Sequence, residues 1–163
     1  RWGNVLGSAG SVVHVFRRAL KEGRPVPITD PDMTRCWITM DRAVDFCLRA
    51  LQEMRGGEIF MPMLRAALPM DLMYAIDGGY AGTWVHVGVR DGGEKQHESL
   101  VSDTEAVRAL DIGWAFVIEP NWNMPAEREP WAGVKLAEGI TSDRVQRMTY
   151  DELRAAIAAV PEE

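Results

Sequence analysis

The sequence has only two cysteines and three histidines in 163 residues. Cys36 and Cys47 are not in the C-x-x-C spacing of redox and zinc sites, and both lie beside apolar residues. We therefore expect both to be small buried hydrophobic residues of a protein in a reducing compartment. The histidines are scattered, at positions His14, His86 and His97. This scarcity argues against a metal site, and no metal ligands are predicted.

Long apolar runs and excess positive charge are also absent. No apolar run reaches the roughly 18 residues that a membrane span requires, and no positively charged stretch followed by an apolar one indicates export. Eighteen Lys and Arg stand against 24 Asp and Glu, for a net charge of −6 and a pI near 5.1. We expect a cytoplasmic protein that binds neither nucleic acid nor membrane, although a local basic pocket for a small anion is compatible with this balance.

The motifs of common catalytic sites are missing as well. A complete dinucleotide-binding domain would carry G-x-G-x-x-G, but GSAGS at residues 7–11 has its glycines at another spacing and no acidic residue on a second strand about 20 positions later. No Tyr is followed by Lys in a Y-x-x-x-K pair, and neither a G-x-S-x-G elbow nor a P-loop is present. No catalytic residue is predicted within this chain.

The chain does have the composition of a globular protein, with 47% hydrophobic and 26% charged residues, and a length that fits one domain. Apolar periodicity predicts helices over about 11–22, from Thr39 to the Gly56-Gly57 pair, over 71–76, and after a capping box at 149–152. Strands are expected near 4–5, over 58–62, over 84–89 with two different faces, and over 114–120. Residues 121–138, rich in proline and charge, are interpreted as a surface excursion. The order is α/β without steady β-α-β alternation.

Several stretches, taken in order, resemble one family. RWGNVLGSAGSVV resembles the R-[YF]-G-N-V-x-G-S-R-G-S-V segment of bacterial nucleotide-sugar dehydratases. The similarity continues in register through PVPITDPDMTRCWITMDRAVDFCLRAL, GGEIFMP, GVRDGGEKQHESLVS, WAFVIEP and TSDRVQRMTYDELRAAI. On these motifs the chain is identified as a member of the extended short-chain dehydrogenase/reductases of polysaccharide biosynthesis. It is most similar to the inverting UDP-N-acetylglucosamine 4,6-dehydratases, with capsular 4-epimerases and retaining dehydratases as close relatives.

The resemblance implies the C-terminal part of an α/β, Rossmann-like extended short-chain dehydrogenase/reductase fold. Residues 1–23 would end the cofactor domain, residues 24–120 would carry the substrate-binding motifs, and residues 121–163 would form a C-terminal extension and helix. The catalytic Tyr, Lys and acid belong to an N-terminal Rossmann half that these residues do not include. We therefore expect the isolated chain to bind NADP negligibly and to have no turnover.

In the whole enzyme the resemblance implies NADP-dependent oxidation at C4 of UDP-N-acetylglucosamine, loss of water, and reduction at C6 with inversion at C5. This chemistry serves surface polysaccharide or flagellin-sugar biosynthesis, and such enzymes are commonly homo-oligomers. The positions that match cofactor contacts are Val5, Leu6, Gly7, Ser8 and Ala9. Those that match substrate contacts are Asn4, Val12, Thr29, Arg90 and Glu94.

Most of these residues also have an ordinary structural explanation. Asn4 could cap a turn, Val12 could be a helix core residue, and Arg90 could pair in solvent with Asp91 or Glu94. Arg35 could form an ion pair with Asp30 or Asp32 as easily as bind a ligand. The small residues of the 5–9 loop either let backbone approach a cofactor or make a tight turn into a helix.

The sequence also departs from the family pattern in three places. Ala9 replaces an Arg, which removes a charged contact near the cofactor. The turn after Arg90 reads R-D-G-G-E instead of R-P-G-E, which could move Glu94 by a few ångströms, and MLRAALPM replaces K-I-P-S-M. Three alternatives to a dehydratase fragment therefore stay open. They are the 4-epimerase, a separate UDP-sugar-binding module and an inactive remnant.

Overall fold

The computed structural model describes residues 1–79, 83–90, 92–121 and 129–162. The helices are α1 (Val12–Lys21), α2 (Met40–Glu53), α3 (Pro69–Asp77), α4 (Asp103–Ala106) and α5 (Tyr150–Ala158). The strands are β1 (Asn4–Val5), β2 (Val26–Ile28), β3 (Arg35–Ile38), β4 (Ile59–Pro62), β5 (Arg65–Ala67), β6 (Trp84–His86), β7 (Ser99–Val101), β8 (Ala109–Asp111), β9 (Ala115–Ile118), β10 (Val134–Lys135) and β11 (Ile140–Thr141).

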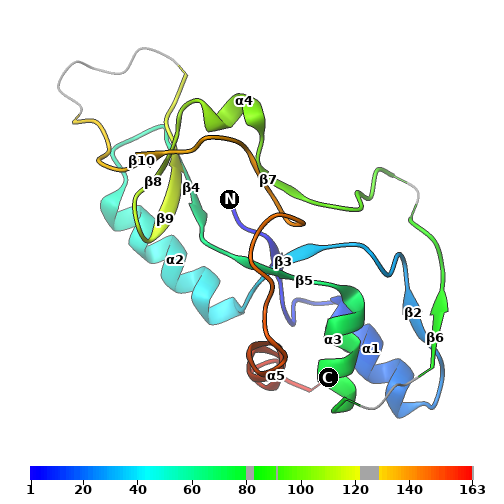
Figure 1. Cartoon of the computed structure of the whole chain (residues 1–163). Coiled ribbons are helices and arrows are strands. Elements are labelled where there is room, and N and C mark those ends of the chain that lie inside the picture. Colours follow the sequence, from blue (N-terminus) through cyan, green and yellow to red (C-terminus); the bar gives the residue numbers. More distant parts are fainter. Residues whose placement is uncertain (80–82, 91, 122–128, 163) are drawn as a thin grey trace.

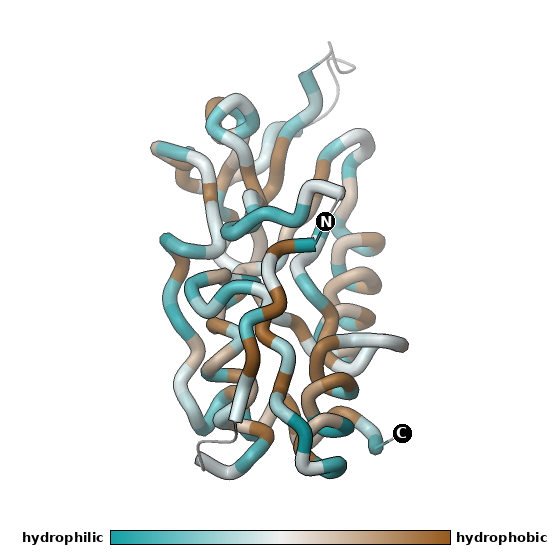
Figure 2. The backbone as a smooth tube through the Cα atoms, turned by 90° about the vertical axis from the view of Figure 1, so that its right-hand side faces the viewer, coloured by the Kyte–Doolittle hydropathy of each residue, from teal (hydrophilic) through white to brown (hydrophobic). Residues whose placement is uncertain are grey.

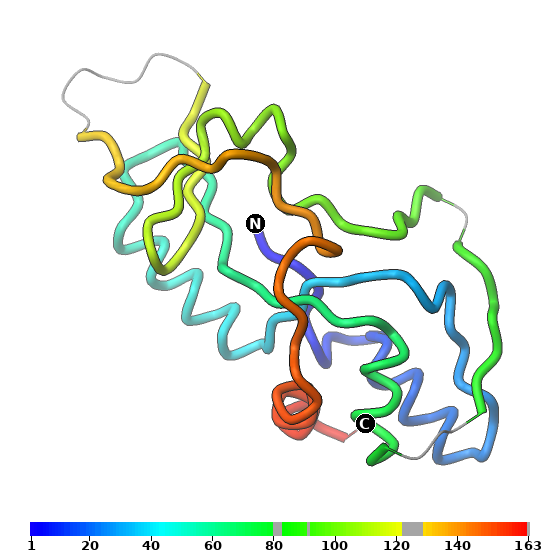
Figure 3. Tube along the Cα trace, viewed as in Figure 1, coloured from blue at the N-terminus to red at the C-terminus, as the bar shows by residue number. Residues whose placement is uncertain are grey.

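The strands form small sheets on either side of a central one. The central sheet has the order β1-β3-β5, with β1 parallel and β5 antiparallel to β3. On one side of it lie α2 and the antiparallel sheet β10-β8-β9-β4; on the other lie α1, α3 and the parallel pair β2-β6 (Figure 1). The chain trace in Figure 3 shows the N-terminal segment and the segment leading into α5 both crossing the middle of the molecule.

Two apolar clusters and an aromatic one hold these layers together. The first cluster joins α1, α3 and α5 through side chains such as Phe16, Leu72 and Leu153. The second lies around the buried residues Met61 and Val101. In the aromatic cluster Phe60 stacks on a Trp ring and meets a second one edge-on. Along the helices, brown and teal stretches alternate in Figure 2, as expected of helices with one buried face.

The strongest local patterns form the elements that they predict. α1 buries Val13 and Phe16 as its 3.6-residue apolar period requires. The capping box at α5 is complete: the Thr149 hydroxyl accepts from the Glu152 amide, and the Glu152 carboxylate accepts from the Thr149 amide at 2.8 Å. The helix predicted over 71–76 begins two residues earlier, at Pro69, because proline at the first position of a helix has the backbone angle that a helix needs.

One predicted strand is shorter than expected. The strand expected over 84–89 ends at His86, and all three of its residues are exposed. The described residues of 121–138 are mostly exposed, as a surface excursion requires, and they add a short exposed strand, β10, that pairs with β8. Residues 122–128, with Pro125, lie outside the described residues. The MLRAALPM stretch contributes β5 to the central sheet.

The two cysteines differ. Cys36 is buried in β3, and burial raises the pKa of its thiol to about 11. The prediction that Cys47 is also buried is wrong, because Cys47 lies on an exposed face of α2. A helical period identifies an apolar face but does not say whether anything covers it.

The Arg1–Glu105 ion pair gives the fold an acid-sensitive contact. The Arg1 guanidinium donates to both Glu105 carboxylate oxygens, at 2.8 and 2.9 Å, and lowers the pKa of Glu105 to about 2. Because the folded-state pKa lies below the ordinary value, this stabilisation is complete above about pH 4.5 and is lost as the pH falls toward 2.

We expect Glu105→Gln to lower the free energy of unfolding at pH 7 by about 1–2 kcal/mol. Gln keeps the α4 capping box that Glu105 forms with Ser102, so the loss isolates the ion pair. Urea unfolding at pH 7 and pH 3 measures it. The difference between the two proteins should be smaller at pH 3, because part of the stabilisation is lost between the unfolded-state pKa and the folded-state pKa of about 2. An equal difference at both pH values would contradict the assignment.

Candidate functional site

A cavity of about 280 Å³ opens beside the start of α1. Seven of the ten residues predicted from the sequence as cofactor or substrate contacts line it: Asn4, Val5, Ser8, Val12, Thr29, Arg90 and Glu94. Its wall also includes Ser11, Arg35 and Trp37, which the sequence-based site did not contain. Segments up to 90 residues apart in the chain therefore meet at one hollow.

The remaining three predicted residues do not line this cavity. Leu6 is buried in the core, and its amide donates to the Ile38 carbonyl at 2.9 Å. Gly7 has a φ of +77°, and a Cβ there would come within 2.6 Å of a Val160 methyl group. Ala9 is exposed. The small size of Gly7 is thus explained by the left-handed turn and by the packing of the C-terminal segment.

Strand direction explains why the cavity forms here. β1 runs parallel to β3, and the loop that follows β1 supplies Ser8 and Ser11. β2 runs parallel to β6, and the residues after their carboxyl ends include Thr29 and Arg90. In open α/β folds ligands bind outside the carboxyl ends of parallel strands, where loops diverge. Two parallel pairs direct such ends at this cavity.

Arg35, which lies in β3, anchors one wall of the cavity to the central sheet. Its side chain is only 8% exposed, and its Nη1 donates to the carbonyls of Thr34 and Gln96 at 2.8 and 3.1 Å. Its Nη2 donates to the Lys95 carbonyl at 2.8 Å. These bonds fix the 94–98 turn, so Arg35 orders the segment that carries Glu94.

Two carboxylates neutralise the buried Arg35 charge. Glu94 Oε1 lies 3.6 Å from Nη2, and Glu98 Oε1 lies 3.7 Å from Nε. The alternative of a pair with Asp30 or Asp32 is wrong: the Asp30 carboxylate instead accepts from the Asp32 amide at 2.8 Å and closes a local turn. Proximity in the sequence favours the nearby aspartates as ion-pair partners of Arg35, whereas the fold places the distant 94–98 turn beside it.

Glu94 also fixes the backbone of Arg90. The Arg90 amide donates to Glu94 Oε2 at 3.0 Å, while the Arg90 guanidinium is 3.9 Å from the same oxygen through Nε. The Arg90 side chain is 76% exposed and Glu94 only 21%. Arg90 therefore has a fixed base and a guanidinium open to solvent at the cavity rim. Asp91, the other expected partner, lies outside the described residues.

Two polar atoms at the cavity wall have no hydrogen-bond partner. These are the indole Nε1 of Trp37 and the hydroxyl of Ser11, both buried. Trp37 lies in β3 opposite Asn4, and both residues line the cavity. Sequence reasoning missed it because Trp in an apolar strand indicates core packing, and nothing local distinguishes a cavity-facing indole.

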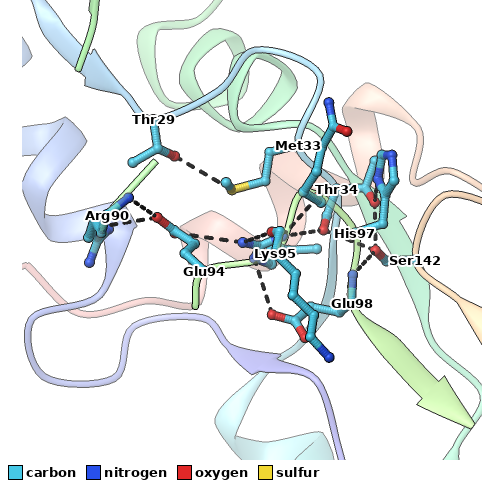
Figure 4. A network of polar contacts seen from close by, with 11 residues as sticks. Thr29, Met33, Thr34, Arg90, Glu94, Lys95, His97, Glu98 and Ser142 are labelled. Carbon is cyan, nitrogen blue, oxygen red and sulfur yellow. Dashed lines mark hydrogen bonds and ion pairs between the residues drawn. The ribbon is translucent and has the colours of Figure 1, made fainter. Parts of the chain in front are cut away.

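A buried polar network supports the back of the 94–98 turn. The Thr34 hydroxyl bonds His97 Nδ1 at 2.8 Å, and the Ser142 hydroxyl donates to the Thr34 carbonyl at 3.0 Å (Figure 4). The Glu98 amide donates to the same Ser142 hydroxyl at 2.8 Å. His97 is thus held in a structural network. Within the described part of the chain, no cluster of three or more His, Cys, Asp or Glu could hold a metal ion.

Among the described residues, no helix is both long enough and apolar enough to cross a lipid bilayer.

Comparison with known proteins gives a consistent result. The model of the "Polysaccharide biosynthesis protein" family matches residues 1–120. Two inverting UDP-N-acetylglucosamine 4,6-dehydratases from Campylobacter jejuni strains are 38% and 36% identical over 124 residues, which is 74% of this chain and 36% of each relative. A UDP-glucose 4-epimerase from Rickettsia akari is 31% identical over 164 residues, which is 94% of this chain and 47% of the relative.

The fold is also found in a solved structure. The X-ray structure of Pen from Bacillus thuringiensis superposes with a TM-score of 0.84 at 27% sequence identity, over 100% of this chain and 49% of Pen. The α/β arrangement described above is accordingly that of a Rossmann-like extended short-chain dehydrogenase/reductase part. The chain spans half or less of the length of each of these relatives.

Proposed function

We propose that this chain, which belongs to the polysaccharide biosynthesis protein family, forms the substrate-binding part of an inverting UDP-N-acetylglucosamine 4,6-dehydratase. The family includes nucleotide-sugar dehydratases and epimerases. Assignment of this chain to a dehydratase substrate site rests on the cavity, where Asn4, Thr29, Arg90 and Glu94 converge beside two pairs of parallel strands. Their convergence is the observation that carries the proposal.

The chemistry of these side chains suits a nucleotide sugar. Arg90 presents a fork of donors that matches phosphate oxygens, and its exposed guanidinium leaves those donors available for a diphosphate. Glu94 can accept from a ribose or sugar hydroxyl, and the Asn4 amide can both donate and accept. Arg35 contacts no ligand in this proposal; it holds the turn on which Glu94 lies.

The cofactor of the whole enzyme is proposed to be NADP, consistent with the NAD(P) use typical of this family. The described residues fit one edge of such a site. Val5 and Ser8 line the cavity, and a Cβ at Gly10 would meet no atom within 4 Å, so backbone is accessible there. When bound, the cofactor supplies hydride acceptance at C4 and hydride return at C6. Leu6, Gly7 and Ala9 do not line the cavity, and in this proposal they fix the backbone conformation of the loop that contacts the cofactor.

The domain assignment is part of the same proposal. Residues 1–23 contribute the last strand and loop of a cofactor domain, residues 24–120 the substrate site, and residues 121–163 a C-terminal extension whose α5 packs under α3 through Leu153 and Ile157. Because no Y-x-x-x-K pair is in the sequence, the isolated chain should show no turnover. In a product assay, formation of a 4-keto sugar by the purified chain would contradict this.

Isothermal titration of the chain with UDP-N-acetylglucosamine tests the binding proposal. We expect measurable binding, and Arg90→Ala should weaken it about 10- to 100-fold, because a charge-assisted bond contributes about 1.5–3 kcal/mol. Arg144→Ala is the matched control, since Arg144 is an exposed Arg that pairs with Glu138 and does not line the cavity. UDP alone and N-acetylglucosamine alone separate diphosphate from sugar recognition. No heat at millimolar ligand would favour the inactive remnant.

A 4-epimerase is the second candidate. The epimerase from Rickettsia akari aligns over 94% of this chain, whereas the Campylobacter jejuni dehydratases align over 74%. The two activities differ in product: an epimerase returns an intact sugar inverted at C4, and a dehydratase releases water and a 4-keto-6-deoxy sugar. Product analysis of an enzyme completed with its cofactor half decides between them.

A further inference from the structure

Helix α5 ends without the residues that usually stabilise a helix C-terminus. Its last turn holds no basic residue, and its C-cap is Ala159 in the right-handed conformation instead of a glycine in the left-handed one. The last carbonyls of a helix lack the usual partner within the helix, so they need donors from elsewhere. Another part of the fold must therefore hold the end of α5.

Arg17 of α1 supplies these donors. Its Nη1 donates to the carbonyls of Val160 and Pro161 at 3.0 and 2.9 Å, and its Nη2 donates to the Ile157 carbonyl at 2.9 Å. Bonds from a charged donor are stronger than those between neutral groups, and a cation is favoured at a helix C-terminus. One guanidinium thus fixes where residues 157–161 lie against α1.

The segment that Arg17 holds packs on the loop that follows β1. Val160 is 6% exposed, and a Cβ at Gly7 would lie 2.6 Å from one of its methyl groups. His14, also on α1, donates from its ring Nε2 to the Gly7 carbonyl at 3.3 Å. His14 and Arg17 are three residues apart, so they share one face of α1. This face therefore holds both the Gly7 peptide and the segment that packs on it.

Gly7 lies between two residues that line the cavity. Val5 and Ser8 are part of the cavity wall, whereas Gly7 and Val160 are not. The amide and the hydroxyl of Ser8 both donate to the Val5 carbonyl, at 3.5 and 3.2 Å. These are long bonds, which hold the turn weakly. The packing of Val160 on Gly7 therefore adds a constraint that the turn's own bonds do not supply.

We propose that residues 157–161, which Arg17 holds against α1, keep the 5–9 loop in the conformation in which the cavity binds its nucleotide sugar. Arg17 and Val160 are positioning residues, because neither lines the cavity and both act through Gly7. This inference rests on the proposed function, which supplies the ligand. It concerns a segment outside the region that the family model matches, because that match covers residues 1–120.

A structural role and a positioning role lead to different results. If residues 157–161 only stabilise the fold, their loss lowers the melting temperature and leaves the affinity of the folded molecules unchanged. If they position the loop, the folded molecules bind more weakly, because apparent affinity falls with the fraction of molecules in the binding conformation.

Arg17→Met removes the three bonds to the end of α5. We expect it to weaken the binding of UDP-N-acetylglucosamine about five- to tenfold, measured by isothermal titration at a temperature where circular dichroism shows the variant to be folded. Arg17→Lys keeps the charge but not the fork of donors, so it should be intermediate. Arg154→Met is the matched control, since Arg154 is exposed on α5, lies over the Tyr150 ring and does not line the cavity.

Val160→Ala tests the same contact from its other end. The substitution leaves the carbonyl that Arg17 bonds and removes the methyl groups that pack on Gly7. Because both variants loosen the same loop, the double variant with Arg17→Met should bind about as weakly as the weaker single variant. Losses that multiply in the double variant would contradict a shared action through Gly7.

Hydrogen exchange of the loop gives a second readout that needs no ligand. The Leu6 amide donates to the Ile38 carbonyl, and the Ser11 amide donates to the Ser8 carbonyl. In the Arg17→Met and Val160→Ala variants both amides should exchange at least about tenfold faster. Amides of β9, which lies between β8 and β4, report global opening and should change far less. Unchanged loop exchange and unchanged affinity in a folded but less stable variant would overturn the proposal.

The two readouts separate this proposal from the proposed function. Faster loop exchange in the variants, in a chain that does not bind UDP-N-acetylglucosamine, would leave the positioning role of residues 157–161 standing and remove the ligand assignment. Binding of UDP-N-acetylglucosamine that neither variant weakens would support the ligand assignment and overturn the positioning role.

Discussion

Arg35→Met is expected to lower the free energy of unfolding by about 3–5 kcal/mol, because it removes three charge-assisted hydrogen bonds that a buried guanidinium donates. The substitution removes one donor from each of three carbonyls, of which the Lys95 carbonyl has no second donor among the described residues, and it leaves Glu94 and Glu98 without the cation between them. For a domain of this size the melting temperature should fall by roughly 6–20 °C. Differential scanning calorimetry measures the change.

Arg144→Met is the control for Arg35→Met. The Arg144–Glu138 pair is 60% and 68% exposed, and removing such a surface pair changes stability by about 0–1 kcal/mol. Arg35→Lys keeps the charge but cannot form the same fork of bonds, so it should be intermediate. Equal effects of Arg35→Met and Arg144→Met would contradict the anchoring role.

Arg35→Met should also weaken binding of UDP-N-acetylglucosamine, measured at a temperature where the variant is folded. Arg90 remains in this variant, but the turn that fixes its backbone through Glu94 is no longer held. A variant that is less stable yet binds with unchanged affinity when folded would show that Arg35 is structural only.

Gly7→Ala is expected to destabilise the chain by about 2–4 kcal/mol, from a left-handed backbone angle and a steric clash together. The φ of Gly7 is +77°, and the new Cβ would come within 2.6 Å of Val160. Val160 is itself buried in the first apolar cluster, so it cannot move aside freely. Urea unfolding measures the loss.

Gly10→Ala separates the two causes. Gly10 has a similar φ of +69°, but its Cβ would meet no atom within 4 Å. Gly10→Ala should therefore lower the free energy of unfolding only by the backbone strain, about 1 kcal/mol. The double variant Gly7→Ala with Val160→Ala should recover part of the difference. Equal losses at Gly7 and Gly10 would mean that packing against Val160 contributes nothing.

The departures from the family pattern have structural consequences that the sequence could not supply. The extra residue in the R-D-G-G-E turn still leaves Glu94 at the cavity, bonded to the Arg90 amide. Ala9 is exposed and does not line the cavity. The altered turn therefore does not by itself remove Glu94 from the site, and the binding assay on Arg90 remains a fair test.

Local patterns in the sequence determined several elements and the family. The capping box at Thr149 predicted α5, the apolar period predicted α1 and α2, and the ordered motifs identified the polysaccharide biosynthesis family. These features rest on interactions within a few residues, such as a cap bond or one helical turn. Such interactions depend only on residues that are close in the sequence, so they can be predicted without knowing how the rest of the chain folds.

Only the tertiary structure decided which residues meet. Arg35 bonds a turn about 60 residues away instead of the nearby aspartates. Gly7 is small because Val160 packs against it, and Trp37 of β3 lines the cavity together with Asn4 of β1. Val44, Leu48 and Leu51 of α2 have the helical period of a buried face and are nevertheless exposed. Contacts between distant segments depend on strand order and packing, which no local spacing encodes.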